Sequence, residues 1–352
     1  MSILSRYLGR EALAGSIAAA LVLTFLGLTG RLVRYLEEAA NGTLAPELVF
    51  AIVAGRVPGV LQIVLPLALF LGVLLMVGRL YADQEAAALR AAGFGRRQLA
   101  RTLAFPVFIV FAATLGLSLY VSPKTAEWVQ RQVETGRQVA GIAGLSPQQF
   151  QSIGDQAVFY ASDALDDGRM EDVFVYQSGP LDTVFKAEFA FQQQDSESGQ
   201  RFLVLQQGQR WRGDVQRLDW ERLDFKEYMV RLELPDLRQG PLKVEALQTE
   251  DLLSGGNREQ AQLHWRVALA LMVPIGALLA MAMGPVAPRS GRWTKFLPGV
   301  LLFIVYFGLV NYVHSQMIDG KLPMLWGIWP VHLFMFCVAQ GLSWQNRRRG
   351  LA

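Results

Sequence analysis

Apolar residues gather in six long runs, three near each end of the chain. The first run, residues 12–30, contains no charged side chain and is flanked by Arg10, Glu11 and Arg31. As an α-helix it would be about 28 Å long at 1.5 Å per residue, which matches the apolar core of a bilayer. The other runs cover residues 48–77, 103–121, 267–283, 296–312 and 324–342. The pattern therefore predicts three membrane-spanning helices on either side of a central polar segment.

The central segment has the pattern of a β domain. Short runs rich in Val, Phe, Tyr and Leu are separated by turns containing Gly, Asp and Ser. In the clearest run, we expect Phe185, Ala187, Phe189 and Phe191 on one face, with charged residues opposite. Many short strands favour a sandwich, a jelly roll or a half-open barrel. The predicted fold is an α-helical membrane protein with six transmembrane helices (3+3) and an inserted all-β, jelly-roll-like domain, divided into residues 1–122, 123–262 and 263–352.

Charge divides the chain in the same way. Residues 123–262 carry 15 Lys/Arg and 23 Asp/Glu, net −8, whereas the rest of the chain is net +11. Charged residues make up 18% of the chain, against about 25% in a typical soluble domain, which excludes a single soluble globule. Basic residues also concentrate on one side of the expected helices, thirteen against five, near residues 6–10, 79–101, 289–295 and 347–349. The positive-inside rule therefore predicts cytoplasmic termini and a β domain on the opposite side.

Residues typical of catalysis or metal binding do not form a recognisable pattern. No G-x-x-x-x-G-K-[ST] motif occurs, so nucleotide hydrolysis would require another subunit. His264, His314 and His332 lie on separate elements without the spacing of metal ligands, and Cys337 is the only cysteine. We therefore expect a protein that is not an enzyme and that uses no cofactor.

Arginines occur at the outer end of the first predicted helix, where the orientation rule disfavours positive charge. Arg31 and Arg34 are three residues apart and share one helix face, and Arg56 enters the second apolar run at a similar depth. Such long side chains can simply extend to the membrane interface. Alternatively, the three guanidiniums can bind phosphate bidentately, as an anionic amphiphile would require. Arg31, Arg34 and Arg56 are therefore candidate phosphate-binding residues.

A short cytoplasmic helix is predicted between the second and third apolar runs, over residues 83–92. Asp83 and Glu85 near its start and Arg90 near its end suit the helix dipole, and two glycines follow. Such a helix can be a capped connector in solvent, or it can dock into the groove of a partner. In the second case, Asp83, Glu85 and Arg90 are the candidate coupling residues.

Several segments resemble the LptF/LptG permease family, the membrane subunits of the ABC transporter that exports lipopolysaccharide. They are RYLGRE at 6–11, GRLVRYLEEAANG at 30–42, VPGVLQIVLPLALFLGVLLMVGRLYADQE at 57–85, LRAAGF at 89–94, LHWR at 263–266 and APRSGR at 287–292. The resemblance covers nearly the whole chain. Within the family, residues 65–85 and the PRxGR pattern are more similar to the LptF branch.

The resemblance implies a multi-pass protein of a Gram-negative inner membrane, with a periplasmic β-jelly roll. It implies an LptG-like paralogue, a dimer of LptB-like ATPases, and LptC-like and LptA-like jelly-roll proteins as partners, but no nucleic acid. The substrate implied is lipopolysaccharide, taken from the inner membrane toward the outer membrane. Glu85 matches the acidic residue of the family's coupling helix, although Asp83 and Gln84 depart from the family pattern. Arg31 and Arg34 match basic residues that face lipopolysaccharide phosphates in the family.

Large apolar residues of the β domain allow two interpretations. Phe159, Phe185, Phe189, Phe191 and Leu203 can fill the core of the domain, or they can line a conduit for acyl chains. A conduit would avoid a cost of about 0.8 kcal/mol for each CH₂ group exposed to water. The chain as a whole also allows two functions, a lipid-extracting permease or a membrane-anchored assembly or sensor protein. The short cytoplasmic helix favours the permease, because a passive anchor does not need one.

Overall fold

The protein divides into two compact units, which are described separately. The computed structural model describes residues 3–40, 44, 46–143, 148, 150–153, 157–165, 169–179, 181–194, 201–214, 219–231, 241–285, 295–323 and 326–348. The first unit comprises Met1–Arg31, Val53–Gln130 and Leu242–Ala352, and the second comprises Leu32–Ile52 and Arg131–Pro241. The APRSGR segment, with Arg289 and Arg292, and the terminal Arg349 lie outside the described residues.

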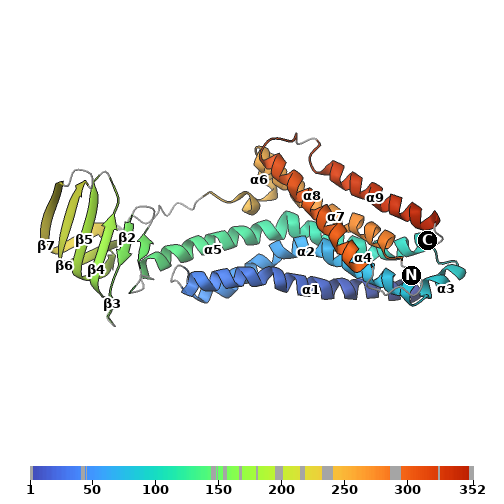
Figure 1. The fold of residues 1–352 in the computed structure, drawn as a ribbon, viewed down its shortest axis with the longest axis horizontal. Coiled ribbons are helices and arrows are strands. Elements are labelled where there is room, and N and C mark those ends of the chain that lie inside the picture. The colour runs from blue at the N-terminus through green and yellow to red at the C-terminus, as the bar shows by residue number, and fades with distance from the viewer. Residues whose placement is uncertain are drawn as a thin grey trace. The chain divides into compact units, whose positions relative to one another are not determined.

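Helices form the first unit (Figure 1). The helices among the described residues are α1 (Ile3–Ala40), α2 (Pro46–Ala82), α3 (Glu85–Ala91), α4 (Arg96–Gly116), the π-helical turn η1 (Leu117–Val121), α5 (Ser122–Ala143), the 3₁₀ turn η2 (Val244–Ala246), α6 (Thr249–Leu253), α7 (Asn257–Met283), α8 (Phe296–Ile318) and α9 (Trp329–Arg348). Helix α7 contacts α4, α8 and α9 and is central to the apolar core. In the most apolar segments of α2 and α7, 61% and 67% of residues are buried, against 17% in α1 and 22% in α8. Helices α1 and α8 therefore expose long apolar faces.

Five helices among the described residues are long and apolar enough to cross a membrane. They are Ile3–Ala40, Pro46–Ala82, Arg96–Thr135, Asn257–Met283 and Phe296–Ile318, and they contain the first five predicted apolar runs. The sixth run, 324–342, overlaps α9, which is not among the five. Helix α9 begins only at Trp329, and its C-terminal half includes Gln340, Gln345 and Asn346, which lower its hydropathy. A sixth span therefore stays a prediction.

The short helix α3 is shorter than the helix predicted over 83–92. The amide of Asp83 donates to the carbonyl of Arg79 at 2.9 Å, so Asp83 closes the last turn of α2 instead of starting α3. Gln84 follows with a left-handed φ of 62°, which separates the two helices. After α3, Gly93 has a φ of 81°, a conformation that glycine adopts without strain. The predicted stop at the glycines is thus confirmed, and the predicted start is wrong.

The second unit contains an antiparallel β-sheet (Figure 1). Its described strands are β1 (Gln151–Ile153), β2 (Ala157–Tyr160), β3 (Asp163–Ala164), β4 (Met170–Gln177), β5 (Asp182–Gln194), β6 (Arg201–Asp214) and β7 (Asp219–Arg231). The strand order is β1-β2-β4-β5-β6-β7, with β3 paired to β4. The predicted β character of this segment is confirmed, and its strand pairs are antiparallel. Because the described strands form one sheet in nearly sequential order, the jelly roll stays a prediction.

The face that each strand turns to the core changes partway along the sheet. One row of core residues contains Val173, Ala187 and Phe225, and another contains Met170, Ala190, Leu205 and Tyr228. The rows are three residues apart, an odd spacing that would put them on opposite faces of regular strands. Between them, Asp172 and Gln207 have positive φ angles of 47° and 52°, which reverse the alternation. The single face predicted for β5 is therefore wrong beyond Ala187, because Ala190 is fully buried and Phe189 only half-buried.

Helices α1 and α2 touch through their backbones near the N-terminal third of α1. A Cβ atom at Gly72 would lie only 2.6 Å from the carbonyl oxygen of Ala12 and the amide nitrogen of Ser16. A Cβ atom at Gly15 would lie 3.3 Å from the Cα atom of Gly72. Small residues permit such close crossings between helices in membranes. Gly72 therefore fixes how closely α1 and α2 approach.

We expect Gly72→Ala to destabilise the protein, because the added methyl group meets backbone atoms that cannot move aside locally. Overpacking of this kind costs about 1 to 3 kcal/mol. Gly9→Ala is the matched control, since a Cβ at Gly9 in α1 meets nothing within 4 Å and alanine favours helix. The measurement is the melting temperature of the purified protein in detergent. Equal melting temperatures for the two variants would contradict the account of this crossing.

Candidate functional site

A polar cavity of about 230 Å³ lies among α1, α2, α5, α7 and α8 in the first unit. Three arginines line it: Arg31 from α1, Arg56 from α2 and Arg266 from α7. Other polar or aromatic lining residues are Gln62, Ser122, Thr125, Glu245, Gln262, Trp265, Asn311 and His314. The cavity therefore combines three guanidiniums with one carboxylate, that of Glu245, and with neutral hydrogen-bonding groups.

Glycines of α2 allow the cavity wall to form. A Cβ atom at Gly55 would lie 2.9 Å from the Trp128 ring, and one at Gly59 would lie 3.6 Å from the hydroxyl of Ser122. Helix α5 can thus pack closely against α2 on both sides of Arg56. This packing brings Ser122 and its neighbours to the same cavity as Arg56.

Arg266 is fully enclosed, with 2% of its surface exposed. Its Nη2 donates to the carbonyls of Glu245 at 3.1 Å and Leu247 at 2.7 Å, and its Nη1 donates to Thr249 Oγ1 at 2.9 Å. The Thr249 hydroxyl in turn donates to the carbonyl of Leu119 in η1. One guanidinium therefore ties α7 to the chain between η2 and α6, and through it to η1.

Three buried polar atoms of the cavity residues have no hydrogen-bond partner among the described residues. They are Arg56 Nε, Gln62 Oε1 and His314 Nε2. The ring of His314 stacks on Trp265, with centroids 4.8 Å apart. Buried polar groups in native proteins nearly always have partners, so three such atoms at one cavity indicate a place for a polar ligand or water. Arg56 Nε needs an acceptor and Gln62 Oε1 needs a donor.

The structure brings together two of the three predicted phosphate-binding arginines, Arg31 and Arg56. Arg34 falls in the second unit, where its guanidinium lies 5.5 Å from the centre of the Tyr35 ring. The sequence prediction missed Arg266 as a cavity residue. In the sequence, Arg266 is a lone arginine directly before the apolar run at 267–283. Its hydrogen-bond partners, at residues 245–249, are not its neighbours in the sequence.

The predicted coupling residues lie around the junction of α2 and α3. Arg79 Nη1 is 3.1 Å from Glu85 Oε1 and 3.8 Å from Asp83 Oδ2. The guanidinium of Arg90 lies 5.7 Å from the centre of the Tyr81 ring. Arg90 and Tyr81 also line a groove of about 50 Å³ with residues of α4, α7 and α9. An ion pair between Arg79 and Glu85 therefore holds the first turn of α3, and Arg90 in its last turn lines a groove.

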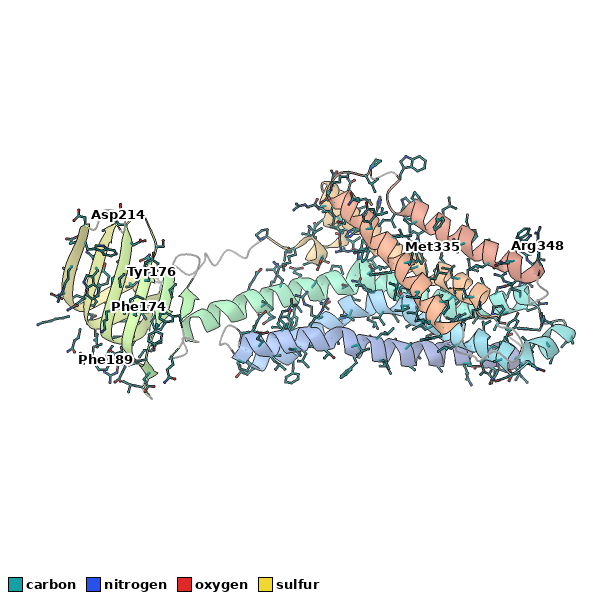
Figure 2. The ribbon with its side chains drawn as sticks, in the orientation of Figure 1. Phe174, Tyr176, Phe189, Asp214, Met335 and Arg348 are labelled. Atoms are coloured by element: carbon teal, nitrogen blue, oxygen red, sulfur yellow. The ribbon has the colours of Figure 1, made fainter. Side chains whose placement is uncertain are left out.

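The predicted conduit residues differ in burial. Phe159, Phe185 and Leu203 are buried in the core of the sheet, with at most 3% of their surface exposed. Phe189, labelled on the sheet in Figure 2, is half-buried, and the guanidinium of Arg169 lies 5.7 Å from the centre of its ring. Phe191 is also half-buried. In the present structure the first three residues pack against the sheet's own apolar side chains.

Comparisons with known proteins give one consistent result. A family model described as the lipopolysaccharide export system permease LptF/LptG matches residues 6–345. The lipopolysaccharide export system permease protein LptF of Escherichia coli strain K12 is 28% identical over 344 residues, covering 96% of this chain and 93% of that protein. LptF of Shigella flexneri matches with the same identity and coverage.

We expect Arg266→Lys to increase local opening of the segment from η2 to α6, because an ammonium cannot form the three hydrogen bonds of the guanidinium in the same geometry. Hydrogen bonds to charged groups contribute about 1.5 to 3 kcal/mol each. The measurement is amide hydrogen exchange over residues 243–253, which should become at least tenfold faster. Arg258→Lys, at an exposed position of α7, is the control and should leave exchange unchanged. Unchanged exchange in Arg266→Lys would rule out the anchoring role.

Proposed function

The chain belongs to the family of lipopolysaccharide export system permeases LptF/LptG, and on this premise we propose that it is the LptF-type subunit. In this role it extracts lipopolysaccharide from the inner membrane and passes it to a periplasmic bridge toward the outer membrane. The likeness to LptF of Escherichia coli over 96% of the chain supports the choice of branch. The observation that carries the mechanism is the cavity lined by Arg31, Arg56 and Arg266.

The cavity suits the head group of such a lipid. Guanidinium forks match phosphate oxygens, and Arg56 Nε is a buried donor in need of an acceptor. Gln62 Oε1 needs a donor, which a fully ionised phosphate does not offer and a sugar hydroxyl does. A phosphorylated sugar meets both needs. We therefore assign Arg31 and Arg56 to phosphate contacts, and Arg266 would add positive charge to the wall of the cavity. Arg34 would extend the basic face of α1 that begins at Arg31.

The membrane topology belongs to the same proposal. Helix α9 would be the sixth span, since its 20 residues cover about 30 Å at 1.5 Å per residue. Both termini would be cytoplasmic and the β domain periplasmic, as the distribution of Lys and Arg favours. The domain would be a jelly roll, within the boundaries 1–122, 123–262 and 263–352.

We propose separate subunits for the remaining steps of transport. The sequence has no phosphate-binding loop motif, so ATP hydrolysis would take place in a dimer of LptB-like ATPases. The exposed apolar faces of α1 and α8 suit an LptG-like paralogue and the acyl chains of the substrate. Asp83, Glu85 and Arg90 would receive the ATPase, with α3 as the coupling helix.

The β domain would connect with LptC-like and LptA-like proteins. A conduit lined by Phe159, Phe185, Phe189, Phe191 and Leu203 would keep acyl chains out of water. The core-facing rows of the sheet are apolar along most of their length, which supports this role. Because Phe159, Phe185 and Leu203 are enclosed, the sheet would have to open for lipid to reach them.

We expect the double variant Arg31→Gln, Arg56→Gln to lose lipopolysaccharide during purification, because two charge-assisted contacts are removed. Each contact contributes about 1.5 to 3 kcal/mol, or roughly a tenfold or greater change in affinity. The measurement is the amount of lipid per complex in mild detergent, determined by mass spectrometry. Arg258→Gln with Lys321→Gln removes the same charge from exposed positions and should retain lipid. An unchanged lipid content in the Arg31, Arg56 variant would disprove the assignment.

A further inference from the structure

One guanidinium joins three helices at the end of the first unit where α2 meets α3. Arg79, in the last turn of α2, forms a bidentate ion pair with Glu11 of α1, with Nε to Oε1 at 2.5 Å and Nη2 to Oε2 at 2.7 Å. Its remaining Nη1 donates to Glu85 Oε1 at 3.1 Å, in the first turn of α3. The hydroxyl of Tyr7 accepts a fourth hydrogen bond, from Nη2 at 3.2 Å. Arg79 is therefore the common partner of α1, α2 and α3.

This arrangement differs from an ordinary surface ion pair. The side chains of Arg79 and Glu11 are mostly enclosed, at 22% and 26% exposure, so solvent screens them less than a fully exposed pair. The planar fork of arginine fits a carboxylate with two parallel hydrogen bonds and still has a donor left. Lysine carries its charge at one point and cannot serve Glu11 and Glu85 in the same geometry.

Helix α3 depends on contacts outside itself. It has seven residues, which is too short for stable helix in isolation. Gln84 at its N-cap makes no side-chain capping hydrogen bond. The pairing of Glu85 with Arg79 and the burial of Ala86 supply tertiary support at its first turn. The position of α3 relative to α1 is thus set through Arg79.

The α1–α2 pair extends from this junction to the cavity. Its helices are in backbone contact at Gly15 and Gly72, and a Cβ at Gly27 would lie 3.0 Å from Val60 Cγ1. Arg31 and Arg56 line the cavity farther along the same two helices. From Glu11 to Arg31, α1 covers about 30 Å at 1.5 Å per residue. The two packed helices thus form a continuous physical connection between α3 and the cavity.

We infer that Arg79 is a positioning residue of the transport cycle, which locks the coupling helix α3 to α1 so that motion received from an ATPase shifts the arginines of the cavity. The inference rests on the proposed function, because it assumes that an ATPase acts on α3. Arg79 would itself contact neither lipid nor nucleotide. Its role is to convert ATP hydrolysis at one end of the helices into movement at the other.

The test uses the complete transporter, with its partner permease and ATPase, reconstituted in liposomes containing lipopolysaccharide. The variants are Arg79→Gln, Arg79→Lys, Glu11→Gln and the double variant Glu11→Gln, Arg79→Gln. The readout is lipopolysaccharide transported per ATP hydrolysed, measured alongside lipid content and assembly. Arg101→Gln, at an exposed position of α4 on the same basic side, is the matched control.

We expect Arg79→Gln and Glu11→Gln to lower transport per ATP at least threefold while lipid content, assembly and ATP hydrolysis persist. The double variant should be no worse than Arg79→Gln, since both changes break one link, and Arg79→Lys should be intermediate. Control-like ratios in Arg79→Gln, additive losses in the double variant, or failure of all variants to assemble would each overturn the inference. Failure of the proposed function itself would be seen separately, because the unmodified transporter would then move no lipopolysaccharide.

Discussion

A guanidinium among apolar helices must find hydrogen-bond acceptors, because an unpaired buried charge costs several kcal/mol. Arg266 and Arg79 meet that requirement in different ways. Arg266 binds two backbone carbonyls and a hydroxyl, and Arg79 binds the carboxylates of Glu11 and Glu85. Arg56 keeps a buried Nε without a partner among the described residues. Arg266 and Arg79 hold helices together, whereas Arg56 Nε is a donor that the proposed phosphate group would satisfy.

Polar and apolar surfaces both occur on the helices of the first unit. Arginines, Gln62 and His314 provide polar groups at the cavity, whereas α1 and α8 expose apolar side chains along their lengths. The proposed substrate, an anionic amphiphile, needs polar groups for its head group and an apolar surface for its acyl chains. The Gly15 and Gly72 contact and the Arg79 ion pairs hold α1 against α2 at a distance from the cavity to which these helices contribute Arg31 and Arg56.

Local patterns predicted the features that depend on neighbouring residues in the sequence. Apolar runs predicted five of the helices. Arg31 and Arg56 were predicted as neighbours because they lie at similar depths in the first two predicted helices, and both line the cavity. Features that depend on distant contacts could not be predicted in this way. The partners of Arg266 come from residues 245–249, and the reversal of β5 beyond Ala187 accompanies positive φ angles on neighbouring strands. The start of α3 was missed because Asp83 completes α2 through its backbone amide.

The central claim is that the cavity binds a phosphorylated sugar head group through Arg31 and Arg56. The most direct measurement is an electron cryomicroscopy structure of the complete transporter with lipopolysaccharide bound. The account predicts a phosphate oxygen within about 3.2 Å of a nitrogen of Arg31 and of Arg56 Nε, with a sugar hydroxyl donating to Gln62 Oε1. Head-group phosphates bound at other residues, with only water in this cavity, would contradict it.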